Sequence, residues 1–230
     1  MLAVLCLLVV IFITPILFII MNSFKGKLYI SDNPFNWPSG DMFAGLENYT
    51  EGIRKTGFFA AFGWSAFITV GSVLVIVLFT SMTAWYITRV KTRLSNTLYY
   101  LFVFSMVVPF QMVMFTMSKL ADMLKLNNPV GMIFLYLGFG AGLSVFMFCG
   151  FVKSIPLEIE EAAMIDGCTP IQTFFQIVMP ILKPTAITVA ILNAMWVWND
   201  YLLPYLVIGV STPYKTIPVA VQYLMGSYGA

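Results

Sequence analysis

Apolar side chains fill five long stretches of the chain, and polar segments separate these stretches. They cover residues 2–21, 62–87, 97–117, 130–152 and 184–209. A helix needs about 20 apolar residues to cross the hydrocarbon core of a bilayer, and each stretch is close to or above that length. We therefore expect an all-α polytopic membrane protein, with five membrane-spanning helices in a single transmembrane domain over residues 1–230.

The first stretch is expected to remain as a membrane span. Fifteen of its residues are Leu, Ile, Val or Phe, and at the usual values per residue they favour insertion by about 5 to 9 kcal/mol. The apolar run is longer than that of a secretory signal peptide, no basic residue precedes it, and no small-residue cleavage pattern follows it. A removable signal peptide is therefore the weaker interpretation.

The third apolar stretch and the polar segment 22–57 are each expected to be irregular. The third stretch is interrupted by Pro109 and Gln111, and a proline inside a membrane helix removes one backbone hydrogen bond and kinks the helix. Residues 22–57 are polar and contain several prolines and glycines, so we expect an extramembrane loop with little regular structure.

The basic residues indicate the orientation of the chain. Arg89, Lys91 and Arg93 follow the second stretch with no acidic residue among them. Because loops rich in Lys and Arg stay in the cytoplasm, this turn is predicted to be cytoplasmic. Counting spans from this turn also places the N-terminus and the polar segment 153–183 in the cytoplasm.

Segment 153–183 carries the signals of a short helix near its start. Ser154 can cap a helix whose first turn tolerates Pro156, and several glutamates follow, which favour the positive end of the helix dipole. Gly167 suits a left-handed position, and Pro170 comes three residues later. A helix of about three turns that ends near Asp166 is expected.

This short helix is expected to be amphipathic. Ile155, Ile159, Ala162 and Ala163 lie at helical spacing on one face, with the carboxylates mostly on the other. An apolar face at a membrane surface can be buried by lipid or by a partner protein.

The composition excludes several classes of function. The chain is 60% hydrophobic and 10% charged and has no histidine, so it lacks the commonest metal ligand and proton carrier. Cys6, Cys149 and Cys168 have no metal-ligand spacing and are expected to be packing residues. No metal site, no cofactor and no nucleic-acid partner is expected.

No phosphate-binding loop of the G-x-x-x-x-G-K-[ST] type occurs, so the chain is not expected to be an enzyme that hydrolyses ATP.

The fifth stretch carries polar side chains that could line a path for substrate: Asn193, Trp196, Asn199 and Asp200. Amides and carboxylates bind sugar hydroxyls, and indole rings stack on sugar C–H faces. The alternative is an aromatic belt with a helix-packing Asn–Asp pair, which the sequence leaves open. Asp200 lies about 24 Å along a helix from Pro184, away from the bilayer centre.

The polar segment contains a spaced motif. Glu161-Ala162-Ala163 is followed by three residues, Gly167, nine residues and then residues 177–180, Ile-Val-Met-Pro. This pattern resembles the EAA loop of binding-protein-dependent ABC importer permeases, with Met where the family usually has Leu. The resemblance implies a type I ABC importer permease of the MetI-like fold. It implies that this helix couples the permease to a cytoplasmic ATPase through Glu161, Ala162, Ala163, Asp166 and Gly167.

A second resemblance concerns the substrate. Residues 196–204, WVWNDYLLP, are similar to a stretch of carbohydrate-importing members, and residues 216–222 with Tyr228 and Gly229 are similar to the external segment that follows it there. This implies import of a sugar or oligosaccharide across the inner membrane of a bacterium or archaeon. It also implies four partners besides the lipid bilayer: a second permease subunit, two cytoplasmic ATPase subunits and an extracytoplasmic substrate-binding protein.

Several alternatives stay open. Family members have a sixth span, so the resemblance predicts a truncated permease. The EAA loop is shared with permeases for amino acids, phosphate or peptides. An ion-coupled secondary transporter would be expected to carry charges near the bilayer midplane and an internal repeat, neither of which the sequence shows.

Overall fold

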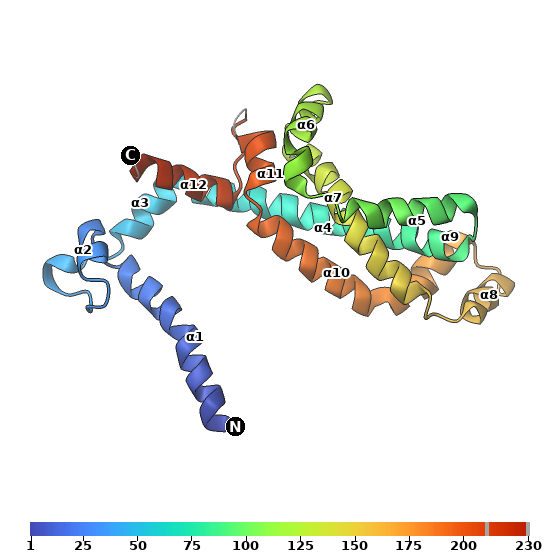
Figure 1. Ribbon diagram of the computed structural model, residues 1–230, viewed down its shortest axis with the longest axis horizontal. Helices are drawn as coiled ribbons and strands as arrows, with labels where there is room; N and C mark the ends of the chain where they lie inside the picture. Colours follow the sequence, from blue (N-terminus) through green and yellow to red (C-terminus); the bar gives the residue numbers. More distant parts are fainter. Residues whose placement is uncertain (210–211, 229–230) are drawn as a thin grey trace. The chain divides into compact units, whose positions relative to one another are not determined.

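The computed structural model describes residues 1–209 and 212–228, and in this part of the chain no strand forms (Figure 1). Lys25 and Phe43 make an isolated antiparallel bridge. The chain divides into two compact units, which are described separately: residues 1–59 together with the segment from residue 221 on, and residues 60–220.

The first unit begins with the apolar helix α1 (Leu2–Ser23), whose described side chains are mostly exposed. The helices that follow are α2 (Lys27–Asp32), the 3-10 helix η1 (Gly40–Met42) and α3 (Glu47–Thr56). The expectation of little regular structure over residues 22–57 is therefore wrong. Helix α3 forms because Glu47 lies in its first turn and Arg54 and Lys55 in its last, which complements the helix dipole. Gly57 then ends it with a left-handed backbone at φ +60°.

The second unit is built on three long helices: α4 (Phe58–Arg89), α7 (Pro129–Val152) and α10 (Met179–Asn199). Helix α7 packs against α10 and against α5 (Arg93–Ser105). Small residues allow this close packing, as is common for membrane helices. An added Cβ at Gly142 of α7 would lie 2.9 Å from the backbone oxygen of Phe102 in α5.

The third apolar stretch is a broken pair of helices and not one kinked helix, which corrects the sequence-based expectation. Helix α5 ends at Ser105, helix α6 (Phe110–Met123) begins after Pro109, and the two are bent by 106°. Pro109 cannot donate a backbone hydrogen bond and adopts an extended backbone before α6. In the described residues, four helices are long and apolar enough to cross a membrane, or five if this bent pair counts as one span.

The fifth apolar stretch also differs from its expected bounds of residues 184–209. Helical structure begins earlier, with α9 (Pro170–Thr173) and the π-helix η2 (Phe174–Val178), and continues through α10 to Asn199. The early start is explained by Thr169 and Gln172, which form a capping box before the first turn of α9. The polar connection after α7 is thus shorter than residues 153–183.

The chain after Asn199 continues in short helices. These are α11 (Leu202–Pro204), the π-helix η3 (Tyr205–Gly209) and α12 (Ile217–Tyr228). Residues 216–222, which are predicted to be external, lie mostly in the first part of α12, and their side of the membrane stays a prediction. Gly229 of that resemblance lies outside the described residues.

Candidate functional site

The short helix expected after the fourth span is α8 (Leu157–Ile165). Its end agrees with the sequence pattern: Asp166 is the C-cap, and Gly167 follows with φ +90°. Its start does not, because Pro156 occupies the N-cap position and makes no side-chain capping bond. Ser154 lies too far upstream to cap α8, and its hydroxyl donates to the Phe151 carbonyl at 2.7 Å.

The buried face of α8 differs from the one expected. Glu160 and Ala163 of α8 are buried, as is Ile155 in the connection before it, whereas Ile159 and Ala162 are exposed. Helix α8 packs against α9 and η2. A carboxylate thus lies on the side that was expected to be apolar.

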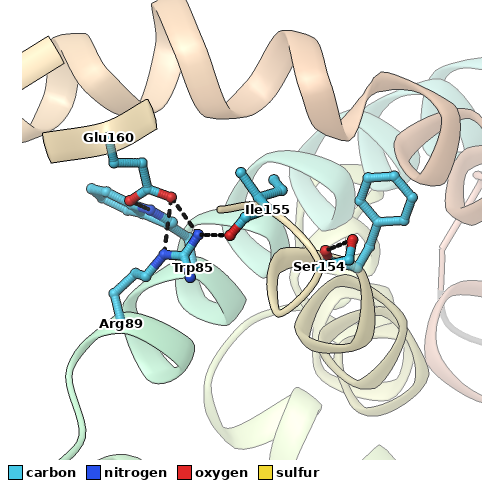
Figure 2. Close-up of polar contacts among 6 residues, drawn as sticks. Trp85, Arg89, Ser154, Ile155 and Glu160 are labelled. Carbon is cyan, nitrogen blue, oxygen red and sulfur yellow. Dashed lines mark hydrogen bonds and ion pairs between the residues drawn. The ribbon is translucent and has the colours of Figure 1, made fainter. Parts of the chain in front are cut away.

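Glu160 is buried because three groups bind its carboxylate (Figure 2). Arg89 at the end of α4 donates to Oε1 from Nε at 2.9 Å and from Nη2 at 2.6 Å. The indole Nε1 of Trp85 donates to Oε2 at 2.8 Å. The same Nη2 of Arg89 also donates to the carbonyl of Ile155 at 3.0 Å. Charge-assisted bonds of this kind satisfy both oxygens and offset the cost of removing the charge from water.

Sequence reasoning missed this cluster. In the sequence, Arg89 is one residue of a basic turn, and Glu160 is one of several neighbouring acids. The available signal was the spacing of Trp85 and Arg89, four residues apart, which places an indole and a guanidinium on one face at the end of a helix.

The outer side of α8 carries most of the residues that the motif singled out. Glu161, Ala162, Asp166 and Gly167 are exposed, while Ala163 is buried against the rest of the unit. Apolar side chains accompany them, and Ile165 is 86% exposed. This surface combines carboxylates with apolar area that another protein could cover.

The polar residues of the fifth stretch fall into two places. Asn193 is buried, and its Nδ2 donates to the Ser144 hydroxyl at 3.2 Å and to the Val189 carbonyl at 2.9 Å. Together with Trp196 it lines a pocket of about 170 Å³. The other lining residues are Phe139, Gly140, Leu143 and Leu192.

Asp200 lies just beyond this pocket, where α10 ends. Its Oδ2 accepts a hydrogen bond from the hydroxyl of buried Tyr136 at 3.0 Å, and its Oδ1 accepts one from the backbone N–H of Leu202 at 3.0 Å. The Tyr136 ring meets the Trp196 ring edge to face at 5.4 Å. Tyr136 therefore connects the pocket to Asp200, a role that the sequence did not indicate.

Asn199 does not join this group. It is exposed, and its Nδ2 donates to the Met195 carbonyl of its own helix at 2.7 Å. Of the four path candidates, Asn193, Trp196 and Asp200 are brought together through shared neighbours, and Asn199 is not. Within residues 1–209 and 212–228 no group of three metal-binding side chains is found.

The fold and these sites define a polytopic α-helical membrane protein with a short surface helix between two of its spans. Residues 76–229 match the model of the family described as "Binding-protein-dependent transport system inner membrane component". The chain belongs to this family, and is therefore a transport permease of the inner membrane with several spans. The predicted MetI-like class of fold is confirmed.

Named relatives and a solved structure agree with this assignment. The chain is 40% identical to the "Probable starch degradation products transport system permease protein AmyC" of Thermoanaerobacterium thermosulfurigenes, over 94% of this chain and 77% of that protein. It is 33% identical to the "Multiple sugar-binding transport system permease protein MsmG" of Streptococcus mutans, over 95% and 79%. The fold matches a chain of a bacterial ABC transporter involved in import of the acidic polysaccharide alginate with a TM-score of 0.79 at 20% identity, covering 98% and 77%.

Proposed function

We propose that this chain forms part of the translocation path for a sugar or oligosaccharide in an ATP-driven ABC importer. Its partners are a second permease subunit, two cytoplasmic ATPase subunits and an extracytoplasmic substrate-binding protein. The observation that carries the proposal is the two-sided character of α8. Its inner side is bonded to α4 through Glu160, and its outer side offers Glu161, Ala162 and Ile165 to a partner.

The basic turn supports the orientation that this function needs. Arg89, Lys91 and Arg93 follow α4 directly, and such residues favour the cytoplasmic side. Since Arg89 contacts Glu160, α8 lies on the same side of the membrane as this turn. Two spans separate the N-terminus from this turn, so the N-terminus is then cytoplasmic as well.

A sugar is favoured as substrate by two lines of support. Related permeases are named for starch degradation products and for multiple sugars. In this chain, the amide of Asn193 and the indole of Trp196 line the same pocket. The carboxylate of Asp200 is linked to this pocket by Tyr136, which donates a hydrogen bond to Asp200 and packs its ring against Trp196. In the proposed mechanism, the ATPases close when they bind ATP, and this closure moves α8. The spans then tilt, so that the path is open alternately to the outer and to the inner side of the membrane.

The substrate class can be tested with the whole importer in proteoliposomes. The chain is reconstituted with its second permease and ATPases, and the substrate-binding protein is added on the outer side. Uptake of labelled maltotriose and raffinose is compared with uptake of glutamine and phosphate, with and without ATP inside. ATP-dependent uptake of a sugar alone is expected. Uptake of glutamine or phosphate, or uptake driven by a proton gradient without ATP, would contradict the proposal.

The role of α8 can be tested at Gly167. A β-branched residue there must adopt φ +90°, which costs about 1–2 kcal/mol and distorts the end of α8. Gly167→Val is expected to lower sugar transport per ATP hydrolysed about tenfold, with normal insertion in the membrane. Gly150→Val in α7 is the control. At both glycines an added Cβ meets nothing within 4 Å in the described residues, but of the two only Gly167 has a positive φ. Equal coupling in the two variants would refute the assigned role.

A further inference from the structure

The contacts of Glu160 join three separate segments at one buried point. The carboxylate comes from α8, its donors Arg89 and Trp85 come from the end of α4, and Arg89 also binds the Ile155 carbonyl in the connection before α8. The side chains of Arg89 and Glu160 are only 18% and 3% exposed. Water has little access to this ion pair, so water cannot readily replace either partner.

Trp85 extends the cluster to a fourth segment. Its ring lies 5.5 Å from the ring of Phe174, which is buried at the first residue of η2. Trp85 thus holds the carboxylate of α8 with its N–H and packs with its ring on the π-helix that precedes α10. Because Trp85 and Arg89 are four residues apart, both contacts come from one face of α4.

This arrangement limits how α8 can move. Sliding or turning α8 against α4 would separate a buried carboxylate from its guanidinium, and an isolated buried charge is strongly unfavourable. Helix α4 is 32 residues long, roughly 48 Å at the helical rise per residue. Toward its other end, the Ser65 hydroxyl accepts a hydrogen bond from the backbone N–H of Ile217 at 2.8 Å. A displacement of α8 that is carried by α4 would therefore reach the start of α12.

We propose that Arg89 and Trp85 are positioning residues that fasten α8 to α4, so that the two helices move as one body when the ATPases act. This inference rests on the proposed coupling function of α8. It assigns to Arg89 a task that the neighbouring cations do not share. Lys91 and Arg93 are exposed, and each can favour the cytoplasmic side of the membrane as well as Arg89 does.

Transport coupling provides the first test. In the reconstituted importer, maltotriose uptake and ATP hydrolysis are measured together for Arg89→Gln, with Lys91→Gln as the matched loss of charge. Arg89→Gln is expected to lower transport per ATP about tenfold, and Lys91→Gln to leave it unchanged. The double variant Arg89→Gln with Glu160→Gln is expected to recover part of the loss, because two amides leave no buried unpaired charge. Normal coupling in Arg89→Gln would overturn the inference.

Trp85→Phe is a second variant for the same coupling measurement, which is used if the Arg89→Gln protein is not inserted in the membrane. This variant keeps an aromatic ring beside Phe174 and removes only the N–H donor to Glu160. We expect a smaller loss of coupling, about threefold, at normal permease levels. No loss in this variant would count against the inference in the same way.

A distance measurement tests joint motion without any sugar. Spin labels are attached at the exposed positions Tyr86→Cys in α4 and Glu158→Cys in α8, after replacement of the three native cysteines. The distance between the labels is compared in the nucleotide-free importer and in the importer trapped with ATP and vanadate. An unchanged, narrow distance is expected in both states, and a broad or shifted one after Arg89→Gln. A distance that shifts between the two states with Arg89 intact would overturn the inference.

The two proposals fail in different ways. If Gly167→Val uncouples transport and Arg89→Gln does not, only the fastening of α8 to α4 is wrong. If Gly167→Val leaves coupling intact, the coupling role of α8 itself is wrong.

Discussion

Gly140 illustrates how a single position determines the geometry of the pocket. An added Cβ there would lie 2.8 Å from Oδ1 of Asn193 and 2.8 Å from Cδ1 of Ile76. Asn193 is held by the Ser144 hydroxyl and by a carbonyl of its own helix, so its amide has little freedom to withdraw. The absence of a side chain at Gly140 therefore allows α4, α7 and α10 to meet at this amide.

Gly140→Ala is expected to destabilise the permease by about 1–3 kcal/mol, because the extra methyl group overpacks a buried site. Gly138→Ala in the same helix is the control, since a Cβ there meets nothing within 4 Å. The melting temperatures of the two purified variants are compared in detergent, and maltotriose uptake is measured in parallel. Equal melting temperatures would show that the amide can move aside and does not fix the pocket.

Among the helices, the end of α10 is the feature that most affects the proposed path. The helix stops at Asn199, Asp200 adopts an extended backbone, and α11 starts two residues later. The Asp200 carboxylate stabilises this break by accepting from the N–H of Leu202 and from the hydroxyl of Tyr136. A short acceptor side chain before a helix commonly satisfies its free N–H groups in this way.

Asp200→Ala removes both hydrogen bonds and leaves the buried Tyr136 hydroxyl without its acceptor, at a cost of about 1–3 kcal/mol. If Asp200 lines the path, the variant also changes the KM for maltotriose uptake. Asn199→Ala is the control, because within the described residues the Asn199 amide donates to a carbonyl of its own helix. A lower melting temperature with an unchanged KM would assign Asp200 to helix packing alone, which was the alternative interpretation of this stretch.

The sequence locates the long helices α1, α4 and α7 and the end of α8, for a physical reason. Apolar runs of sufficient length and a glycine at a left-handed position are local properties that the chain displays directly. The contact between Glu160 and Arg89 joins residues 71 positions apart, and no local pattern encodes it. The break at Pro109 was visible as a proline, but its angle depends on how α5 and α6 pack, which the sequence alone does not specify.

The chain as a whole combines an exposed apolar span, a packed group of helices and a short surface helix. Among the candidate spans in the described part of the chain, helix α1 is the most apolar, and most of its side chains are exposed within the chain. The packed unit carries both the pocket beside Asn193 and the bonded base of α8. These features fit the proposed role as one subunit of an importer, in which α8 receives motion from the ATPases and the substrate path lies between the long helices.

The most direct measurement is a photo-crosslink from the outer side of α8. A benzophenone amino acid replaces Ile165, which is 86% exposed, and in a second variant it replaces Phe146 in α7, which is 46% exposed. The whole importer is irradiated in membranes and the crosslinked chains are identified by mass spectrometry. We expect the probe at position 165 to crosslink to the ATPase subunit and the probe at position 146 not to do so. A crosslink from position 165 to lipid alone, or to the extracytoplasmic binding protein, would contradict the central claim that α8 transmits ATPase motion to the permease.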